Sequence, residues 1–121
     1  MTEAQPWPVD ISLNPEKNRL TVSFDNGSSF DLDAELLRVE SPSAEVQGHG
    51  ADQKVTPAGK RYITINGITP VGNYAVRLTF SDGHDTGLFT WEILYRYGRE
   101  QDQMMQDYLA RLAAMGLSRE G

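Results

Sequence analysis

Two histidines and the carboxylates beside them are the residues with the clearest chemical potential in this chain. His49 precedes Asp52 by three positions, while His84 follows Asp82 by two positions and directly precedes Asp85. Imidazole and carboxylate groups are competent ligands for zinc or iron. The same residue types also recur in turns for backbone reasons. A metal site built from His49, His84 and Asp85 is therefore the minor hypothesis, and turn formation is the major one.

An iron centre of the oxygenase type fits this pattern poorly. Such a centre holds its metal with two histidines and one carboxylate on one face. His84 and Asp85 are adjacent, so they lack the usual single residue between histidine and carboxylate. The chain is also shorter than the double-stranded β-helix that carries such centres. We expect no resident metal and no cofactor.

Signals of nucleophilic catalysis are also weak. Ser41 and Ser43 stand in a Ser-Pro-Ser sequence, and the chain has no Gly-x-Ser-x-Gly elbow. Gly48, His49 and Gly50 would let backbone amides approach a small anion, but a flexible loop is the preferred interpretation. The absence of cysteine from the sequence excludes thiolate metal sites and cysteine nucleophiles within it. We therefore predict that the chain is not an enzyme.

Composition indicates an ordinary globular domain. The chain has 121 residues, of which 39% are hydrophobic and 23% charged, and a formal net charge of −6. Acidic chains repel phosphate backbones, so we expect no nucleic-acid partner. No apolar run approaches the ~20 residues that span a bilayer, and the N-terminus lacks the features of a secretory signal. We expect a cytoplasmic protein without membrane contact, and a monomer.

Alternating apolar residues predict a mostly antiparallel sheet of short strands. The expected strands cover residues 11–14, 19–24, 28–32, 62–68, 74–80 and 85–89. Asn26-Gly27 predicts a type I′ hairpin turn between the second and third strands, because both residues tolerate positive φ. Residues 81–84, Ser-Asp-Gly-His, predict a second turn. Strands followed by helices are typical of the α+β class.

Three helices are expected to complete the fold. Asp33 would cap the first, which runs through residues 34–38, and Thr90 would cap the second, which runs through residues 91–97. Gly98 is expected to end the second helix. Residues 101–115 carry apolar side chains at steps of three and four, which predicts a separate amphipathic helix. Residues 1–8 are expected to form a flexible arm, residues 9–116 one domain and residues 117–121 a frayed tail.

Three blocks of this sequence resemble, in the same order, the small domain at the front of the γ-butyrobetaine hydroxylases. They are the hairpin-to-helix stretch ending at residues 36–38, the run SPSAEV at 41–46 with GHG at 48–50, and residues 74–97. The domain also occurs alone in bacteria, where it is a domain of unknown function, and attached to Mrp-type iron–sulfur carrier ATPases. The resemblance implies a stand-alone bacterial member of this family.

The resemblance also bears on metal binding. In the animal hydroxylases this small domain holds a structural zinc with three cysteines and one histidine. The resemblance places Ser41, Ser43 and Val46 at the cysteine positions and His84 at the histidine position. Three of the four ligands are therefore missing, so the zinc scheme is not carried over. His84 would instead hydrogen-bond its turn and hold it against residues 41–46, with serine hydroxyls in place of the metal.

These observations lead to one hypothesis and two alternatives. We expect an accessory module that binds another protein, and the resemblance points to an iron–sulfur carrier or an iron-dependent oxygenase as that partner. The expected interaction residues are Ser41, Ser43, Gly48, His49, Gly50, Asp82, His84, Asp85, Trp91 and Glu92. One alternative is a metal- or small-anion-binding protein that uses His49 and His84. The other gives the main role to a docking face on the last helix, formed by Met104, Met105, Leu112 and Met115.

Overall fold

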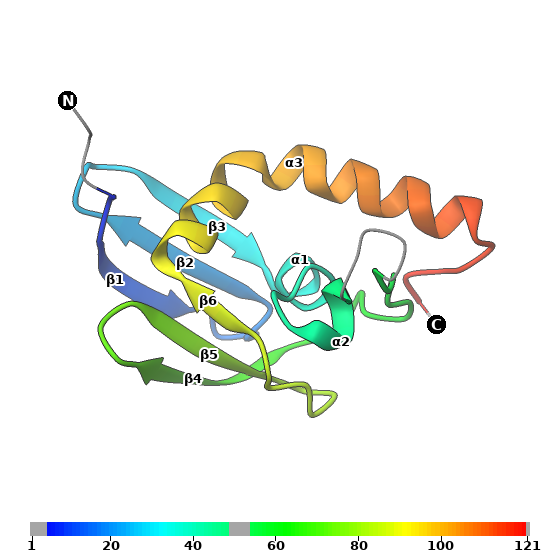
Figure 1. Ribbon diagram of the computed structural model, residues 1–121, viewed down its shortest axis with the longest axis horizontal. Helices are drawn as coiled ribbons and strands as arrows, with labels where there is room; N and C mark the ends of the chain where they lie inside the picture. Colours follow the sequence, from blue (N-terminus) through cyan, green and yellow to red (C-terminus); the bar gives the residue numbers. More distant parts are fainter. Residues whose placement is uncertain (1–4, 49–53, 121) are drawn as a thin grey trace.

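Two antiparallel sheets and one long helix dominate the computed structural model, which describes residues 5–48 and 54–120 (Figure 1). Each sheet has three strands, in the orders β1-β2-β3 and β4-β5-β6. The elements, in chain order, are β1 (Pro8–Leu13), β2 (Arg19–Phe24), β3 (Ser29–Asp33), α1 (Ala34–Val39), α2 (Ala44–Gln47), β4 (Ile65–Val71), β5 (Ala75–Phe80), β6 (Leu88–Thr90) and α3 (Trp91–Ala114). The α+β class predicted from the sequence is confirmed.

The order of elements is repeated in the two halves of the chain. In each half, a meander of three antiparallel strands leads directly into a helix: β3 ends at Asp33 where α1 begins at Ala34, and β6 ends at Thr90 where α3 begins at Trp91. The repeat is clear in the topology, although no internal repeat is evident when the sequence is read alone.

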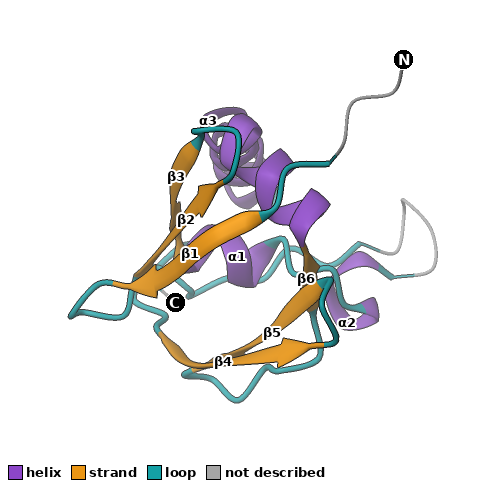
Figure 2. Cartoon of the chain, turned by 90° about the vertical axis from the view of Figure 1, so that its left-hand side faces the viewer, coloured by secondary structure: helices purple, strands orange, loops and turns teal. Residues whose placement is uncertain are grey.

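The two sheets, α1 and the first part of α3 share one hydrophobic cluster. Alternation buries Leu20 and Val22 of β2 completely, and Leu78 of β5 likewise. Leu37 of α1 and Leu94 of α3 belong to the same cluster as these strand residues. Figure 2 shows the two sheets inclined to each other, with α1 between them and α3 beside β3. Burial of this shared apolar surface is the main force that holds the halves together.

The turn between β2 and β3 differs from the predicted type I′ turn. Phe24 O accepts a hydrogen bond from Gly27 N at 3.1 Å, and Phe24 N donates to Ser28 O at 2.8 Å. Gly27 has φ +88°, whereas Asn26 is not among the described residues with positive φ. This pattern is a three-residue loop, a type I turn followed by a glycine bulge. The glycine was located correctly in the sequence, but only this one position needs a positive φ.

Helix α3 corrects the expectation of two separate helices. It runs unbroken from Trp91 to Ala114 and passes through Gly98, which was predicted to be a stop. A Cβ at Gly98 would lie 2.3 Å from Cγ of Phe30. The glycine therefore allows close contact between α3 and β3, which outweighs its low helix propensity. Thr90 caps the helix as predicted, because its side chain accepts a hydrogen bond from Ile93 N.

Both chain ends are more engaged than expected. Pro8, placed in the flexible arm, begins β1, and Trp7 exchanges hydrogen bonds with Asp25. In the predicted frayed tail, Ser118 O accepts from Gly59 N at 2.9 Å and Arg119 O from Arg61 N at 3.1 Å.

The residues of the alternative docking face differ in their exposure. Leu112, proposed for a docking face, is buried with Tyr108, while Met115 remains 58% exposed.

No helix among residues 5–48 and 54–120 is long and apolar enough to cross a membrane.

Candidate functional site

The turn between β5 and β6 is fastened to the segment that links α1 to α2. His84 Nε2 lies 2.9 Å from Ser41 Oγ and 3.3 Å from Ser43 Oγ, and Ser41 Oγ donates to Ser43 Oγ at 3.3 Å. Ser41 is fully buried and Ser43 is 5% exposed, while the His84 side chain is 8% exposed. We call Ser41, Ser43, Asp82 and His84 the histidine–serine junction. The expectation that serine hydroxyls hold His84 in place agrees with this geometry.

Asp82 gives the junction a second set of contacts. Its Oδ1 accepts a hydrogen bond from His84 N at 3.1 Å, which stabilises the turn itself. Its Oδ2 accepts from Arg38 Nε at 2.8 Å and from Lys60 Nζ at 2.7 Å. Burial alone would raise the pKa of Asp82, but the hydrogen bonds from Lys60, His84 N and Arg38 overcome it and hold the pKa far below its ordinary value of 3.8. Asp82 is thus a firmly ionised anchor.

The surroundings of His84 favour its neutral form. Burial lowers the pKa of His84 below its ordinary value of 6.5, and the positive charge of Arg38 lowers it further. The carboxylates of Glu45, Asp82 and Asp85 oppose these effects without reversing them. At neutral pH the ring therefore bonds to the serines as an uncharged imidazole, with one nitrogen donating and the other able to accept.

Close backbone contact completes the junction. A Cβ at Gly87 would lie 2.2 Å from Ser41 Oγ, so a side chain there would displace the serine hydroxyl from its present position. Gln47 Nε2 of α2 donates to Ser41 O at 3.0 Å, and Thr86 Oγ1 donates to Glu45. The Thr86 bond therefore joins the residues after the turn to α2, and the Gln47 bond ties α2 to the segment that carries Ser41.

The structure brings together some of the predicted site residues and separates others. Ser41, Ser43, Asp82 and His84 meet at the junction, Asp85 is exposed directly after it, and Gly48 follows α2. His49 and Gly50 lie outside the described residues.

Trp91 and Glu92 do not lie at the junction. Trp91 donates through its backbone to Tyr74 O at 3.2 Å and through Nε1 to Asn73 O at 2.9 Å, at the turn between β4 and β5. His84 lies at the other end of β5, where its carbonyl bonds Phe80 N. Nearness in sequence was misleading here, because residues 85–90, which end in β6, lead from the His84 turn back to Ala75 at the start of β5.

The residues that the resemblance places at zinc-ligand positions do not suit that metal. Two of these positions hold serine hydroxyls in place of the thiolates that the scheme requires, and the third is Val46, a buried aliphatic side chain with no ligand atom. The two serines and the histidine already bond one another at hydrogen-bonding distance. Within residues 5–48 and 54–120, no group of three histidine, aspartate or glutamate side chains could hold a metal ion.

Two buried glutamates form ion pairs that the sequence did not predict. Glu35 is 6% exposed and forms a two-pronged pair with Arg119, at 2.6 and 2.9 Å. Glu40, also 6% exposed, pairs with Lys54 and Arg111, each at 2.7 Å. The sequence around each glutamate does not indicate these pairs, because the arginine partners lie 84 and 71 positions away.

A comparison with models of known protein families found a match. A family model described as "Gamma-butyrobetaine hydroxylase-like, N-terminal" matches residues 11–95. No curated protein matches the chain.

Solved structures are similar over most of the chain. Two NMR solution structures have 47% and 50% identity and TM-scores of 0.83 and 0.81; they cover 97% and 98% of this chain, and the matches span 92% and 90% of theirs. A crystal structure from Acidithiobacillus ferrooxidans, of a protein with unknown function in the DUF971 family, has 36% identity and a TM-score of 0.64. That match covers 78% of this chain and 96% of the other.

Proposed function

We propose that the chain, which belongs to the γ-butyrobetaine hydroxylase-like N-terminal family, is a non-catalytic module that binds another protein. The family is one of unknown function, so the proposal is based on the site. The observation that carries it is the way in which the polar groups of the histidine–serine junction are used. His84, Ser41, Ser43 and Asp82 all bond partners within the chain.

This use of the junction argues against reaction chemistry there. A catalytic base must reach the proton of a bound substrate, but the His84 ring is largely buried and its Nε2 faces the two serines. Asp82 is held by two cations and its pKa is far below the physiological range, so it is unsuited to proton transfer. The junction instead fixes the position of two surface segments relative to each other.

Those two segments carry an exposed acidic surface. Glu45 on α2 has a side chain 59% exposed, and Asp85 and Thr86 after the turn are exposed as well. The bond from Thr86 to Glu45 joins the segments at this surface. We call Glu45, Asp85 and Thr86 the acidic rim. A rigid acidic surface suits a basic patch on a partner, because charge complementarity orients the encounter and fixes the register.

The family's companions suggest which partner to test. The resemblance links this domain to Mrp-type iron–sulfur carrier ATPases and to iron-dependent oxygenases, so a purified carrier of that type is the first choice. We expect micromolar binding in a titration followed by interferometry, with Glu45→Lys/Asp85→Lys weakening it about tenfold or more.

The control for this experiment changes the same amount of charge elsewhere. Glu100 and Asp102 are exposed on α3, away from the acidic rim. The variant Glu100→Lys/Asp102→Lys should bind as the unmodified protein does. Equal weakening of binding by both variants would show that the net charge, and not the acidic rim, causes the effect. Failure of both a carrier and an oxygenase to bind would contradict the proposed partner class.

A further inference from the structure

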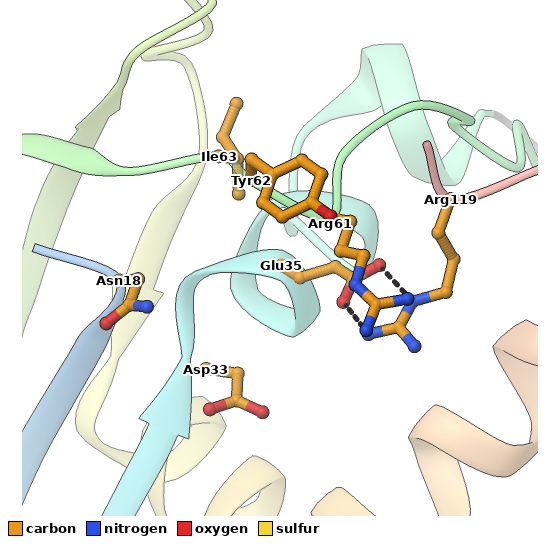
Figure 3. Close-up of a pocket in the computed structure, with 7 residues that line it drawn as sticks. All are labelled: Asn18, Asp33, Glu35, Arg61, Tyr62, Ile63 and Arg119. Carbon is orange, nitrogen blue, oxygen red and sulfur yellow. Dashed lines mark hydrogen bonds and ion pairs between the residues drawn. The ribbon is translucent and has the colours of Figure 1, made fainter. Parts of the chain in front are cut away.

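A pocket of about 260 Å³ lies apart from the histidine–serine junction. It is lined by Asn18, Asp33, Glu35, Arg61, Tyr62, Ile63 and Arg119. In Figure 3, Asn18 and Asp33 lie on one side, Arg61 and Arg119 on the other, and Tyr62 between the two sides. Opposite charges therefore line facing sides of one small hollow.

One ion pair in this pocket is a fixed part of the protein. Arg119 bonds both carboxylate oxygens of Glu35, at 2.6 and 2.9 Å, and Glu35 is only 6% exposed. Removing Arg119 would leave the buried carboxylate of Glu35 uncompensated, which is strongly unfavourable. Neither group is free to bind a ligand, and together they contribute no net charge to the pocket.

The second arginine is held much more loosely. Arg61 Nη1 lies 2.7 Å from Glu120 Oε1, but the two side chains are 45% and 54% exposed. Exposed pairs of this kind contribute little stability. Beside it, Tyr62 is 76% exposed and has the Arg61 guanidinium 6.0 Å from its ring centre. A carboxylate from outside can therefore replace that of Glu120 at low cost.

The facing wall offers a carboxylate. The Asp33 side chain is 49% exposed, makes no capping hydrogen bond to α1, and lies 3.6 Å from Arg19 Nε. A simple anion at Arg61 would face Asp33, and a simple cation at Asp33 would face Arg61. A molecule with both charges satisfies the two walls at once. The volume is below the ~300–1,000 Å³ of pockets for drug-sized ligands, so the molecule must be small.

We propose that this pocket binds a small zwitterion, with its carboxylate on Arg61 and its ammonium group on Asp33. Glu120 occupies the carboxylate position when no ligand is present and competes with the ligand. This inference is independent of the protein-binding function, because it uses none of the residues of the junction or the acidic rim.

The test is an NMR titration of the full chain with matched probes. Glycine carries its two charges close together, and glycylglycine carries them farther apart. N-acetylglycylglycine lacks the cation, and glycylglycinamide lacks the carboxylate. We expect saturable amide shifts at Asn18, Asp33 and Tyr62 with one or both zwitterions, with a Kd of ~1–10 mM for so few atoms. The two blocked probes should bind at least about fivefold more weakly.

Three variants make the result decisive. Arg61→Gln should weaken zwitterion binding about fivefold or more, whereas Arg77→Gln, an exposed arginine on β5, should leave it unchanged. Glu120→Gln removes the competing carboxylate and should tighten binding about twofold to threefold. Shifts that never saturate, blocked probes that bind as well as the zwitterions, or binding unaffected by Arg61→Gln would each overturn the proposal.

Discussion

The two halves of this protein use one backbone turn for two different purposes. In both turns a phenylalanine carbonyl accepts from the glycine three residues later, Gly27 or Gly83, and these glycines have φ of +88° and +89°. In both, the Oδ1 atom of the preceding residue accepts from the backbone N–H two positions later, at 3.0 Å for Asn26 and 3.1 Å for Asp82. The local structure of the two turns is the same.

The surroundings of the two turns differ. Asn26 is neutral, and its Nδ2 donates to the hydroxyl of Tyr95 at 3.1 Å, next to a cluster in which Tyr95 packs edge-on against Phe24 and Phe30. Asp82 is charged and bonds Arg38 and Lys60. The first turn is thus stabilised by aromatic packing and the second by charge and hydrogen bonds. A polar junction that fixes two exposed segments relative to each other is suited to recognition, and this difference is why we propose a binding site at the second turn.

The largest expected effects come from filling the close contact near each turn. Gly98→Ala would place a Cβ within 2.8 Å of three atoms of Phe30, including its Cβ, which cannot move without moving β3. We expect a loss of about 3 kcal/mol of unfolding free energy in urea denaturation. Gly87→Ala meets chiefly the hydroxyl of Ser41, which can rotate away from His84, so we expect about 1–2 kcal/mol. A larger loss for Gly87→Ala than for Gly98→Ala would contradict the interpretation that close packing stabilises the first region and polar bonds the second.

An exchange of Asn and Asp tests the difference in charge. Asp82→Asn keeps the turn acceptor but removes the charge that Arg38 and Lys60 face; the Asp82 side chain is 22% exposed, and we expect a loss of about 2 kcal/mol. Asn26→Asp also keeps the acceptor, and Tyr95 can donate to the new carboxylate, so we expect a change within about 0.5 kcal/mol. Equal losses in urea denaturation would show that charge does not distinguish the turns.

A matched pair of glycine substitutions tests the similarity. A Cβ at Gly27 or at Gly83 would meet nothing within 4 Å, so only the positive φ opposes a side chain there. Gly27→Ala and Gly83→Ala should each cost about 1 kcal/mol, in equal measure. Thermal unfolding of the two variants gives the comparison directly, and a difference above about 1 kcal/mol would mean that the backbones are not equivalent.

The smallest predicted effect is a dependence of stability on pH that only the second turn shows. Because the folded-state pKa of His84 is below 6.5, the unfolded chain takes up the proton first, and stability falls as the pH drops below about 6.5. Asp82 contributes a separate loss that begins below about 3.8. His84→Ala should cost about 1 kcal/mol at pH 7 and should remove the upper of the two losses. Denaturation curves between pH 3 and 8 would contradict this if the variant kept the same loss below pH 6.5.

Local sequence signals predicted the strands and the positions of the turns well. Alternation in β2 and β5 gives the buried residues Val22 and Leu78 directly. The Asn26-Gly27 signal placed the first hairpin but not its type, because one positive φ or two can follow from the same pair of residues. Gly98 was misread for a related reason: a glycine that ends a helix and one that admits a neighbouring ring are identical in sequence.

Sequence distance was a poor guide to the candidate site, because His84 contacts Ser41, which lies 43 positions earlier in the chain, and does not contact its near neighbour Trp91. The contact of His84 with Ser41 and Ser43 agrees with an expectation that came from the family resemblance. The pairing of Glu35 with Arg119 depends on how the end of the chain returns to α1, which no local pattern records. Sequence distance places Trp91 beside His84, although the residues between them lead back along β5, so that Thr90, which precedes Trp91, lies opposite Ala75 at the start of that strand.

The most direct test of the account is an NMR titration of the His84 imidazole through long-range proton–nitrogen correlations. The histidine–serine junction predicts a pKa below 6.5 and, at pH 7, a neutral ring with a single tautomer fixed by its serine bonds. A pKa at or above 6.5, with the two tautomers averaging as in free imidazole, would show that His84 does not fasten the turn and would remove the basis for the rigid binding surface.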